Sequence, residues 1–410
     1  MSLIRPFTGL RPAPGRAAEI AAPPYDVLST AEARIRAAGH PWSFLHISKP
    51  EIDLQEGTDP YSPVVYAKAA ENLRNMLAQG LLVRDPAPAY YAYRLVMGDH
   101  VQTGLVAAAS VADYDTNRIR KHEFTRPDKE DDRVRQIEAI NAQTGPVLLA
   151  YPSCAAVDKL LTATTLNAPD ADVVAADGIR HSIWMIRDPA TQAKLTAAFD
   201  AMPALYIADG HHRSAAASRV AAARRSTADG SSSCEHFLAV IFPHHQMKIM
   251  DYNRVITDLN GHTLPTFLSL IAEKFKVAPE NAPVHPASPG EFGLYLPGQW
   301  YRLTIHDALI PHRDPVGRLD VSLLQNHLIA PVLGINDPRR DKRIDFVGGV
   351  RGLAELERRV NSGEMAVAFA LHPTRMEDLM AVADADEVMP PKSTWFEPKL
   401  ADGLVSHVLD

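Results

Sequence analysis

The sequence has little cysteine, no long apolar run and no excess of basic residues, and each shortage excludes a class of protein. Its 410 residues include two cysteines, Cys154 and Cys234, and neither belongs to a CxxC pair. A disulfide framework or a structural zinc site is therefore not expected. The low cysteine content suits a reducing cytoplasm. The start lacks the apolar core of a signal peptide, and no stretch approaches the roughly 18 consecutive apolar residues of a membrane helix. These features predict a soluble, cytoplasmic protein.

Charge and motif content narrow the functional classes further. The net charge is −7, with 46% apolar and 22% charged residues, which is ordinary for a globular chain. A general nucleic-acid binder would show an excess of basic residues, so nucleic acid is not an expected partner. The expected partner is a small-molecule substrate. The oligomeric state stays open. Walker, GxGxxG, GxSxG and HExxH motifs are missing from the sequence, which excludes the commonest nucleotide, hydrolase and zincin classes.

The patterning predicts a mixed α/β (α+β) fold with antiparallel hairpins rather than regular βαβ units. An amphipathic helix is expected from about Pro63 to Gln79, inside an N-terminal segment over residues 1–88. A phosphate-binding core is expected over 89–260, and a C-terminal α/β portion, whose tail returns to the core, over 261–410. The run STADGSSS, residues 226–233, is typical of a surface loop.

The most informative stretch is LYIADGHHRSAAASRVAAARR, residues 205–225. Its apolar start predicts a strand, and its alanine-rich end predicts a helix. A strand that enters a helix through a glycine turn brings backbone N–H groups and the positive end of the helix dipole together, which favours phosphate. The alternative is a capped helix whose polar start is only solvated. The predicted phosphate-binding residues are Gly210, His211, His212, Arg213 and Ser214.

The side chains of this turn also have predicted chemical roles. Gly210 lets the backbone approach an anion closely, and Arg213 can hold phosphate oxygens through two parallel hydrogen bonds. His211 and His212 are candidate catalytic residues, because imidazole transfers protons near neutral pH. Asp209 is a candidate catalytic residue and the candidate metal ligand, since its carboxylate can orient a histidine or bind a cation.

A second candidate lies in the charged segment RIRKHEFTRPDKEDDRVR, residues 118–135. Glu123 stands between cationic groups and is expected to stay ionised, as a catalytic base requires. The alternative is a solvated loop, because runs of charge usually face water. The candidate substrate contacts in this segment are Lys121, His122, Thr125 and Arg133.

A third candidate is the tail segment MPPKSTWFEPK, residues 389–399. Its prolines forbid a helix. Lys392, Ser393 and Thr394 offer polar groups to a phosphate or an amino-acid carboxylate, so the segment is expected to close over the body near the active site. The alternative is an extended piece that only packs Trp395 and Phe396.

Several motifs occur in an order that resembles one family over nearly the whole chain. They are RPFTGLRP, AAPPYDV, SFLHISKPEIDL, KHEFTRPDKEDDR, ADGHHRSAAA, DFVGG and MPPKSTWFEPKLADGL. Together they resemble the bacterial and archaeal family called domain of unknown function 1015 (DUF1015). The ADGHHR turn alone is similar to the phosphate-binding signature of the ParB/sulfiredoxin-like superfamily. This resemblance implies a ParB/sulfiredoxin-like core with N- and C-terminal elaborations.

The resemblance also implies an activity, because the superfamily includes kinases of free serine. It implies a phosphotransferase acting on a small hydroxylated metabolite, free L-serine first. The donor would be ATP, ADP or pyrophosphate, with Mg²⁺, or the reaction would run in reverse on phosphoserine. Residues 210–214 would bind the donor phosphates, and Glu123 or Asp209 would handle the hydroxyl proton. The alternative is a ParB-like nucleotide-binding regulatory module that binds DNA or protein, which the acidic net charge disfavours.

Overall fold

The computed structural model describes residues 2–225 and 233–410, and the chain divides into two compact units. The first unit comprises Met1–Met247 and Pro398–Asp410, and the second comprises Lys248–Glu397. Each is described by itself below. The three-part division expected from the sequence stays a prediction. The expected loop at 226–233 lies outside the described residues except for Ser233, which begins a short 3-10 turn.

A mixed sheet forms the centre of the first unit and has nine strands among the described residues. Its order is β6-β11-β8-β12-β5-β4-β10-β9, with β1 paired to β5 beside this path. β8 runs parallel to β12 and antiparallel to β11, so strand pairing switches from parallel to antiparallel at β8. The strands are β1 (Ile4–Arg5), β4 (Tyr90–Met97), β5 (His100–Ser110), β6 (Ile119–Arg120), β8 (Val147–Tyr151), β9 (Ala171–Val174), β10 (Arg180–Ile186), β11 (Leu205–Asp209) and β12 (His236–Pro243).

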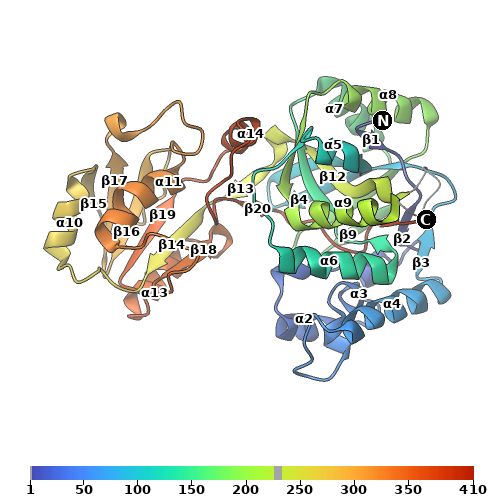
Figure 1. Cartoon of the computed structure of the whole chain (residues 1–410), viewed down its shortest axis with the longest axis horizontal. Helices are drawn as coiled ribbons and strands as arrows, with labels where there is room; N and C mark the ends of the chain where they lie inside the picture. Colours follow the sequence, from blue (N-terminus) through green and yellow to red (C-terminus); the bar gives the residue numbers. More distant parts are fainter. Residues whose placement is uncertain (1, 226–232) are drawn as a thin grey trace. The chain divides into compact units, whose positions relative to one another are not determined.

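Helices cover this sheet and add a helical layer from the N-terminal residues. Figure 1 shows α6 and α9 side by side, with α7 and α8 above them and α2, α3 and α4 below. The helices of the first unit are α1 (Ala17–Ile20), α2 (Thr30–Ala37), α3 (Leu45–Ser48), α4 (Pro63–Ala78), α5 (Val111–Asp115), α6 (Pro127–Ile140), α7 (Ala155–Thr164), α8 (Pro189–Asp200) and α9 (His211–Arg225).

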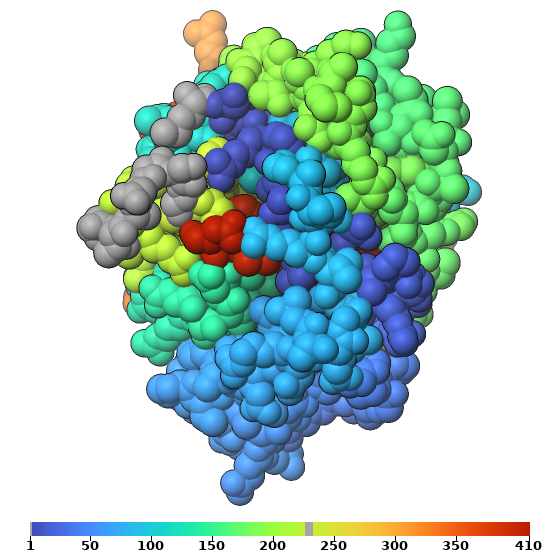
Figure 2. Space-filling model, turned by 90° about the vertical axis from the view of Figure 1, so that its right-hand side faces the viewer, coloured from blue at the N-terminus to red at the C-terminus, as the bar shows by residue number. Residues whose placement is uncertain are grey.

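A small second sheet ties the C-terminal residues to the first unit. β21 (Ser406–Val408) pairs with β2 (Gly9–Pro12) on one side and with β7 (Ala142–Gln143) on the other. β3 (Leu82–Arg84) completes the sheet beside β2. In Figure 2 the C-terminal residues, in red, lie among segments of the N-terminal part of the chain, in blue. The last residues of the chain therefore belong beside its first.

Local sequence signals account for several of these elements. The predicted amphipathic helix is confirmed as α4, with a proline in its first turn, where a missing N–H costs nothing. Ser29 and Glu32 form a capping box at the start of α2. The charged segment is a loop only in its first part, because α6 begins at Pro127. Lys129, Asp132 and Arg133 are therefore helical, which the sequence analysis did not foresee.

The second unit has its own antiparallel sheet, in the order β15-β17-β16-β19-β14-β18. Its strands are β14 (Tyr252–Ile256), β15 (Phe275–Glu280), β16 (Glu291–Leu296), β17 (Gln299–Ile305), β18 (Ile344–Gly348) and β19 (Val367–Leu371), and a separate pair joins β13 (Lys248–Met250) to β20 (Trp395–Glu397). The helices are α10 (Leu264–Ala272), α11 (Asp320–Leu324), α12 (Ala330–Leu333), α13 (Leu353–Asn361) and α14 (Met376–Asp384), with a π-helical turn at Gln325–Ile329 between α11 and α12.

Each unit encloses its own apolar core. In the first unit, Leu205 and Ile207 of β11 and Ala217 and Ala221 of α9 belong to one buried cluster. Both arms of the strand–turn–helix unit are thereby fixed, and the turn between them is held at the edge of the sheet. The predicted mixed α/β fold is confirmed. No helix of the described ranges has the length and hydropathy needed to cross a bilayer.

Candidate functional site

The turn between β11 and α9 requires a glycine for two physical reasons. Gly210 has φ +98°, a conformation that side chains disfavour. A Cβ at Gly210 would also lie 2.9 Å from Nε of Arg213, whose side chain folds back over the turn. The carbonyl of Gly210 accepts hydrogen bonds from the backbone N–H groups of Arg213 and Ser214. The N–H groups of His211 and His212 come first in α9, where no earlier helical carbonyl can accept them.

Arg213 is buried beneath this turn at the centre of a charge cluster. Its side chain is 10% exposed, and Nη1 donates to the carbonyl oxygen of Pro146 at 2.7 Å. Nη2 lies 3.7 Å from Asp26 and 3.6 Å from Asp209. Burial by itself would lower the pKa of Arg213, but these carboxylates outweigh it and raise the pKa. The guanidinium therefore stays charged and packs against the backbone of the turn at Gly210.

Asp209, like Asp26, is a partly exposed acid of this cluster. Its side chain is 39% exposed, and one oxygen lies 3.6 Å from Nζ of Lys399. Burial would raise the pKa of Asp209, but the charges of Lys399 and Arg213 hold it below its usual range. Two cations already face this carboxylate, and no group of three or more potential metal ligands occurs within the described residues. The residues do not form a magnesium site by themselves, so Mg²⁺ at Asp209 stays a prediction.

His211 links the turn to the charged segment. The imidazole is buried, and its Nε2 accepts the backbone N–H of His122 at 3.4 Å. The proton of a neutral ring then sits on Nδ1, which lies 3.4 Å from Oε2 of Glu123. Burial and the neighbouring cationic groups hold the pKa of His211 well below its usual value. A neutral donor thus faces Glu123, whose side chain is 56% exposed.

His122 packs edge-on against His211, with ring centroids 4.4 Å apart. It is 3% exposed, and burial lowers its pKa to about 4. Its Nδ1 is buried without a hydrogen-bond partner in the described part of the chain. The sequence analysis assigned His122 to substrate binding, and this role stays a prediction. The structure places the ring in a buried position against His211.

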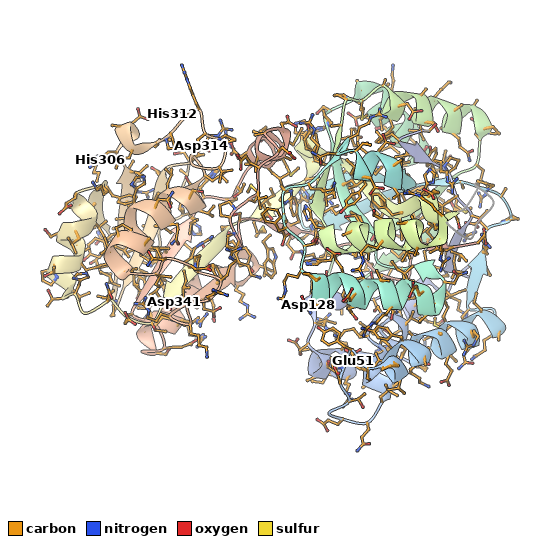
Figure 3. All side chains as sticks on the ribbon, in the orientation of Figure 1. Glu51, Asp128, His306, His312, Asp314 and Asp341 are labelled. Carbon is orange, nitrogen blue, oxygen red and sulfur yellow. The ribbon has the colours of Figure 1, made fainter. Side chains whose placement is uncertain are left out.

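His212 connects the turn to a cavity of about 430 Å³ in the first unit. Its Nε2 accepts the backbone N–H of Arg126 at 3.1 Å, and burial lowers its pKa. The cavity is lined by both basic and acidic side chains, among them Lys49, Arg126, Lys129, Arg133, Asp26, Glu51 and Asp132. Figure 3 labels Glu51 in the N-terminal helical layer and Asp128, an ion-pair partner of Arg126, at the start of α6.

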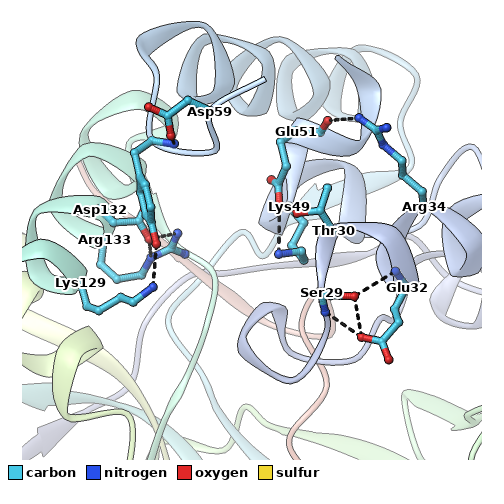
Figure 4. A network of polar contacts seen from close by, with 11 residues as sticks. Ser29, Thr30, Glu32, Arg34, Lys49, Glu51, Asp59, Lys129, Asp132 and Arg133 are labelled. Atoms are coloured by element: carbon cyan, nitrogen blue, oxygen red, sulfur yellow. Dashed lines mark hydrogen bonds and ion pairs between the residues drawn. The ribbon is translucent and has the colours of Figure 1, made fainter. Parts of the chain in front are cut away.

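Two ion pairs line separate walls of this cavity (Figure 4). Lys49 Nζ lies 3.0 Å from Glu51 Oε1, next to the 3-10 turn at Pro50–Asp53. Arg133, on α6, pairs with Asp132 at 2.7 Å. The guanidinium of Arg133 lies 4.0 Å from the ring centroid of Tyr25. Burial raises the pKa of Tyr25 to about 12, so the phenol keeps its proton. The predicted residue Arg133 therefore lies in the cavity wall with an acid and an aromatic ring as partners.

Three other predicted residues have partners inside the protein. Lys121 donates to the carbonyl of Tyr114 at 2.7 Å, with its ammonium 4.2 Å from the Tyr114 ring centroid. Thr125 donates a short hydrogen bond to Glu130. Ser214 is fully buried and donates to the carbonyl of His211 at 3.0 Å. These contacts stabilise the loop and the first turn of α9.

Lys392, Ser393 and Thr394 belong to the second unit. Lys392 has φ +59°, and its ammonium lies 5.7 Å from the ring centroid of Tyr252. Ser393 is buried and donates to the carbonyl of Pro390 at 2.5 Å. Trp395 packs edge-to-face on Tyr252 with centroids 5.3 Å apart. These contacts support the packing alternative for Trp395, and an approach of Lys392, Ser393 and Thr394 to the active site stays a prediction. Lys399, the last residue of the segment, belongs to the first unit and lies 3.6 Å from Asp209.

Residues with no predicted role in the sequence analysis also meet at the turn. They are Asp26, Lys399 and Asp402. Asp402 is 1% exposed, and both of its carboxylate oxygens lack a hydrogen-bond partner among the described residues. Burial raises its pKa to about 7. These three residues lie in AAPPYDV and FEPKLADGL, which are parts of the family-like motifs, so the sequence marked both segments. Nothing in either segment shows that they converge on Arg213.

With this geometry in place, comparisons with known proteins give the family. The family described as protein of unknown function (DUF1015) matches residues 4–322. The chain belongs to this family. No curated protein matches this DUF1015 chain.

Solved structures resemble the DUF1015 chain at low identity. A free serine kinase in complex with AMP is 14% identical, with a TM-score of 0.33, over 73% of this chain and 92% of that one. A conserved hypothetical protein from Pyrococcus furiosus is 16% identical, with a TM-score of 0.31, over 73% of this chain and 95% of that one. SbnI with a C-terminal truncation, from Staphylococcus aureus, is 10% identical, with a TM-score of 0.35, over 72% of this chain and 85% of that one. The ParB-like nature of the turn stays a prediction.

Proposed function

We propose that the first unit is a phosphotransferase that acts on a small hydroxylated metabolite, with free L-serine as the first candidate. The proposed donor is ATP, ADP or pyrophosphate. One observation carries the proposal: His212 belongs both to the glycine turn at the start of α9 and to the wall of the charged cavity. An anion-binding turn and a pocket of metabolite size therefore share a residue.

The donor phosphates are assigned to the turn. The free N–H groups at the start of α9 and the positive end of its dipole favour an anion. Lys399 adds a positive charge beside Asp209. Arg213 contributes from beneath, because its charge is retained although its side chain is covered. Phosphoryl transfer needs mainly such positioning and charge stabilisation from the protein.

Glu123 is assigned as the base that takes the proton of the acceptor hydroxyl. The hydroxyl oxygen forms a new bond to the terminal phosphorus, and the bond from that phosphorus to the donor's bridging oxygen breaks. The leaving group keeps the electron pair, and the hydroxyl proton goes to Glu123. Nδ1 of His211, 3.4 Å from Glu123, orients the carboxylate. The reverse transfer from phosphoserine uses the same groups.

The charge pattern of the cavity supports a zwitterionic acceptor. Carboxylates suit an ammonium group, and the cavity presents Glu51 and Asp132. Cations suit a carboxylate, and the cavity presents Lys49 and Lys129. Free amino acids carry both groups, whereas a sugar or a simple alcohol carries neither. A small amino acid with a hydroxyl group therefore fits better than a neutral polyol.

The test is an assay of purified protein with L-serine, Mg²⁺ and each donor in turn, followed by phosphorus NMR for phosphoserine. Phosphoserine should appear with at least one donor. In the reverse direction, phosphoserine supplied with the spent donor should give serine and the regenerated donor. Glycerol serves as the neutral acceptor control. Nucleotide binding without transfer to serine or any other amino acid would contradict the proposal and favour the regulatory alternative.

A further inference from the structure

A buried arginine in the second unit has no acidic partner. Arg254, on β14, is 4% exposed. Its Nη1 donates a short hydrogen bond to the carbonyl of Tyr252, and its Nη2 donates to the carbonyl of Lys392 at 3.0 Å. The guanidinium carbon lies 5.4 Å from the ring centroid of Phe346, which is directly opposite in the sheet register. No carboxylate pairs with Arg254 in the described part of the chain.

This arrangement is costly unless an anion is present. A buried charge needs a countercharge as well as hydrogen bonds, because carbonyl dipoles replace only part of its lost hydration. Burial lowers the pKa of Arg254 to about 10, which reflects this cost. A guanidinium carries five N–H donors, and two carbonyls do not use them all. The remaining donors are available to a ligand.

The side chain borders a cavity of about 360 Å³ that lies within the second unit. Arg339 adds a second cation to its lining, and Gln325 and Asn336 add amides. The side chain of Arg339 is 68% exposed and pairs at 3.3 Å with Asp337, which also lines the cavity, so this acid already has a partner. Phe346, Pro390 and Pro391 supply apolar walls.

The local backbone gives a separate indication of a ligand site. Gln325 begins the π-helical turn, whose wider spacing interrupts regular helical hydrogen bonding. Such turns are frequent at functional sites. The cavity also brings together Phe346 of the DFVGG motif and Pro390 and Pro391 of the MPPKSTWFEPKLADGL motif.

We propose that this cavity binds a small organic oxyanion, a phosphate ester with a planar body, and that Arg254 supplies the countercharge. The oxyanion contacts the free donors of Arg254, and the planar body packs between Phe346 and the two prolines. This site goes beyond the phosphotransfer assigned to the first unit.

The test uses the full chain with three probes: inorganic phosphate, AMP and adenosine. AMP joins an oxyanion to a planar body, while each other probe carries one part. Binding is measured by calorimetry and located by hydrogen exchange with mass spectrometry. AMP should bind most tightly and should protect residues 252–256 and 344–348. Protection of residues 205–214 would report the first-unit site separately, so either proposal can fail alone.

Matched variants isolate the arginine. Arg254→Met keeps the length of the side chain and should weaken AMP binding at least about 10-fold, the scale for charged hydrogen bonds. Arg302→Met removes an arginine from β17, where it pairs with Glu280 and Glu291, and should leave binding unchanged. Equal AMP affinity in Arg254→Met would overturn the proposal. Adenosine binding as tightly as AMP, or no protection of 252–256, would overturn it in the parent protein, whether or not the variant folds.

Discussion

The two units treat a buried arginine in opposite ways. Arg213, in the first unit, has two carboxylates within 3.7 Å, and a third, that of Asp402, helps to raise its pKa. Arg254, in the second unit, has two carbonyls and no carboxylate among the described residues. The pKa of Arg213 is raised and that of Arg254 is lowered to about 10. The first guanidinium is neutralised by the fold, whereas the second is left for a ligand to neutralise.

This contrast distinguishes a structural charge from a binding charge. A compensated arginine such as Arg213 positions its neighbours and holds a turn, and ligands must then be contacted by the groups around it. An uncompensated arginine keeps free donors and gains most when an anion arrives. Burial alone therefore does not predict the role of an arginine, and the acids around it decide.

The largest expected effect is on turnover in the first unit. Glu123→Gln keeps the size of the side chain but removes the proposed base, so kcat in the serine phosphorylation assay should fall roughly 10²–10⁴-fold. Glu71→Gln, an exposed acid on α4, is the matched control and should leave kcat unchanged. Turnover of Glu123→Gln near that of the parent would show that the carboxylate is structural.

The comparison of the two arginines is tested by matched substitutions to methionine. Arg213→Met removes the cation that lies near both Asp26 and Asp209 and leaves Asp209 with Lys399. The free energy of unfolding should fall by about 2–3 kcal/mol. Breaking a fully buried ion pair costs about 3–5 kcal/mol, and the loss is smaller here because both acids are partly exposed. Arg254→Met should change the free energy of unfolding by about 1 kcal/mol or less, because the loss of two hydrogen bonds is offset by the removal of an uncompensated buried charge. Equal losses in urea denaturation would break the comparison.

Asp402 gives a pH-dependent effect in the first unit. Its pKa is about 7 in the folded protein and 3.8 in the unfolded chain, so the folded state binds the extra proton between these values. Stability from this group is therefore full below pH 4 and is lost as the pH rises to about 7. Asp402→Asn cannot ionise and should lack this loss. Denaturation curves that keep the same pH dependence in both proteins would show that Asp402 ionises freely.

The smallest expected effect concerns Lys392, in the part of the tail segment that belongs to the second unit. Lys392→Ala should lower turnover several-fold, because Lys392 is predicted to contact the substrate. The melting temperature should be nearly unchanged, because a surface lysine contributes little to stability. Lys276→Ala, at an exposed position of β15, is the control for loss of a surface charge. Parent-like kinetics of Lys392→Ala would leave the segment with packing alone.

Local patterns in the sequence predicted the elements that hold the site. The strand, the glycine turn and the alanine-rich helix at 205–225 are confirmed as β11, Gly210 and α9. These follow from the residues alone, because a run of apolar residues, a glycine with positive φ and good helix formers act over a few positions. The sequence named Glu123 and His211 as candidates but did not show whether they meet, and the structure places the pair 3.4 Å apart.

The tertiary structure decided which distant groups surround that turn. Asp26, Lys399 and Asp402 reach it from the two ends of the chain, and the pairing of β21 with β2 and β7 brings the C-terminus there. It also covered Arg213 and His122, which the sequence left open to ligands, and it buried Arg254 without an acid. Burial and countercharge depend on contacts between residues far apart in sequence, so no local pattern specifies them. The sequence determined which residues could carry chemistry, and the packing decided which of them keep a free charge.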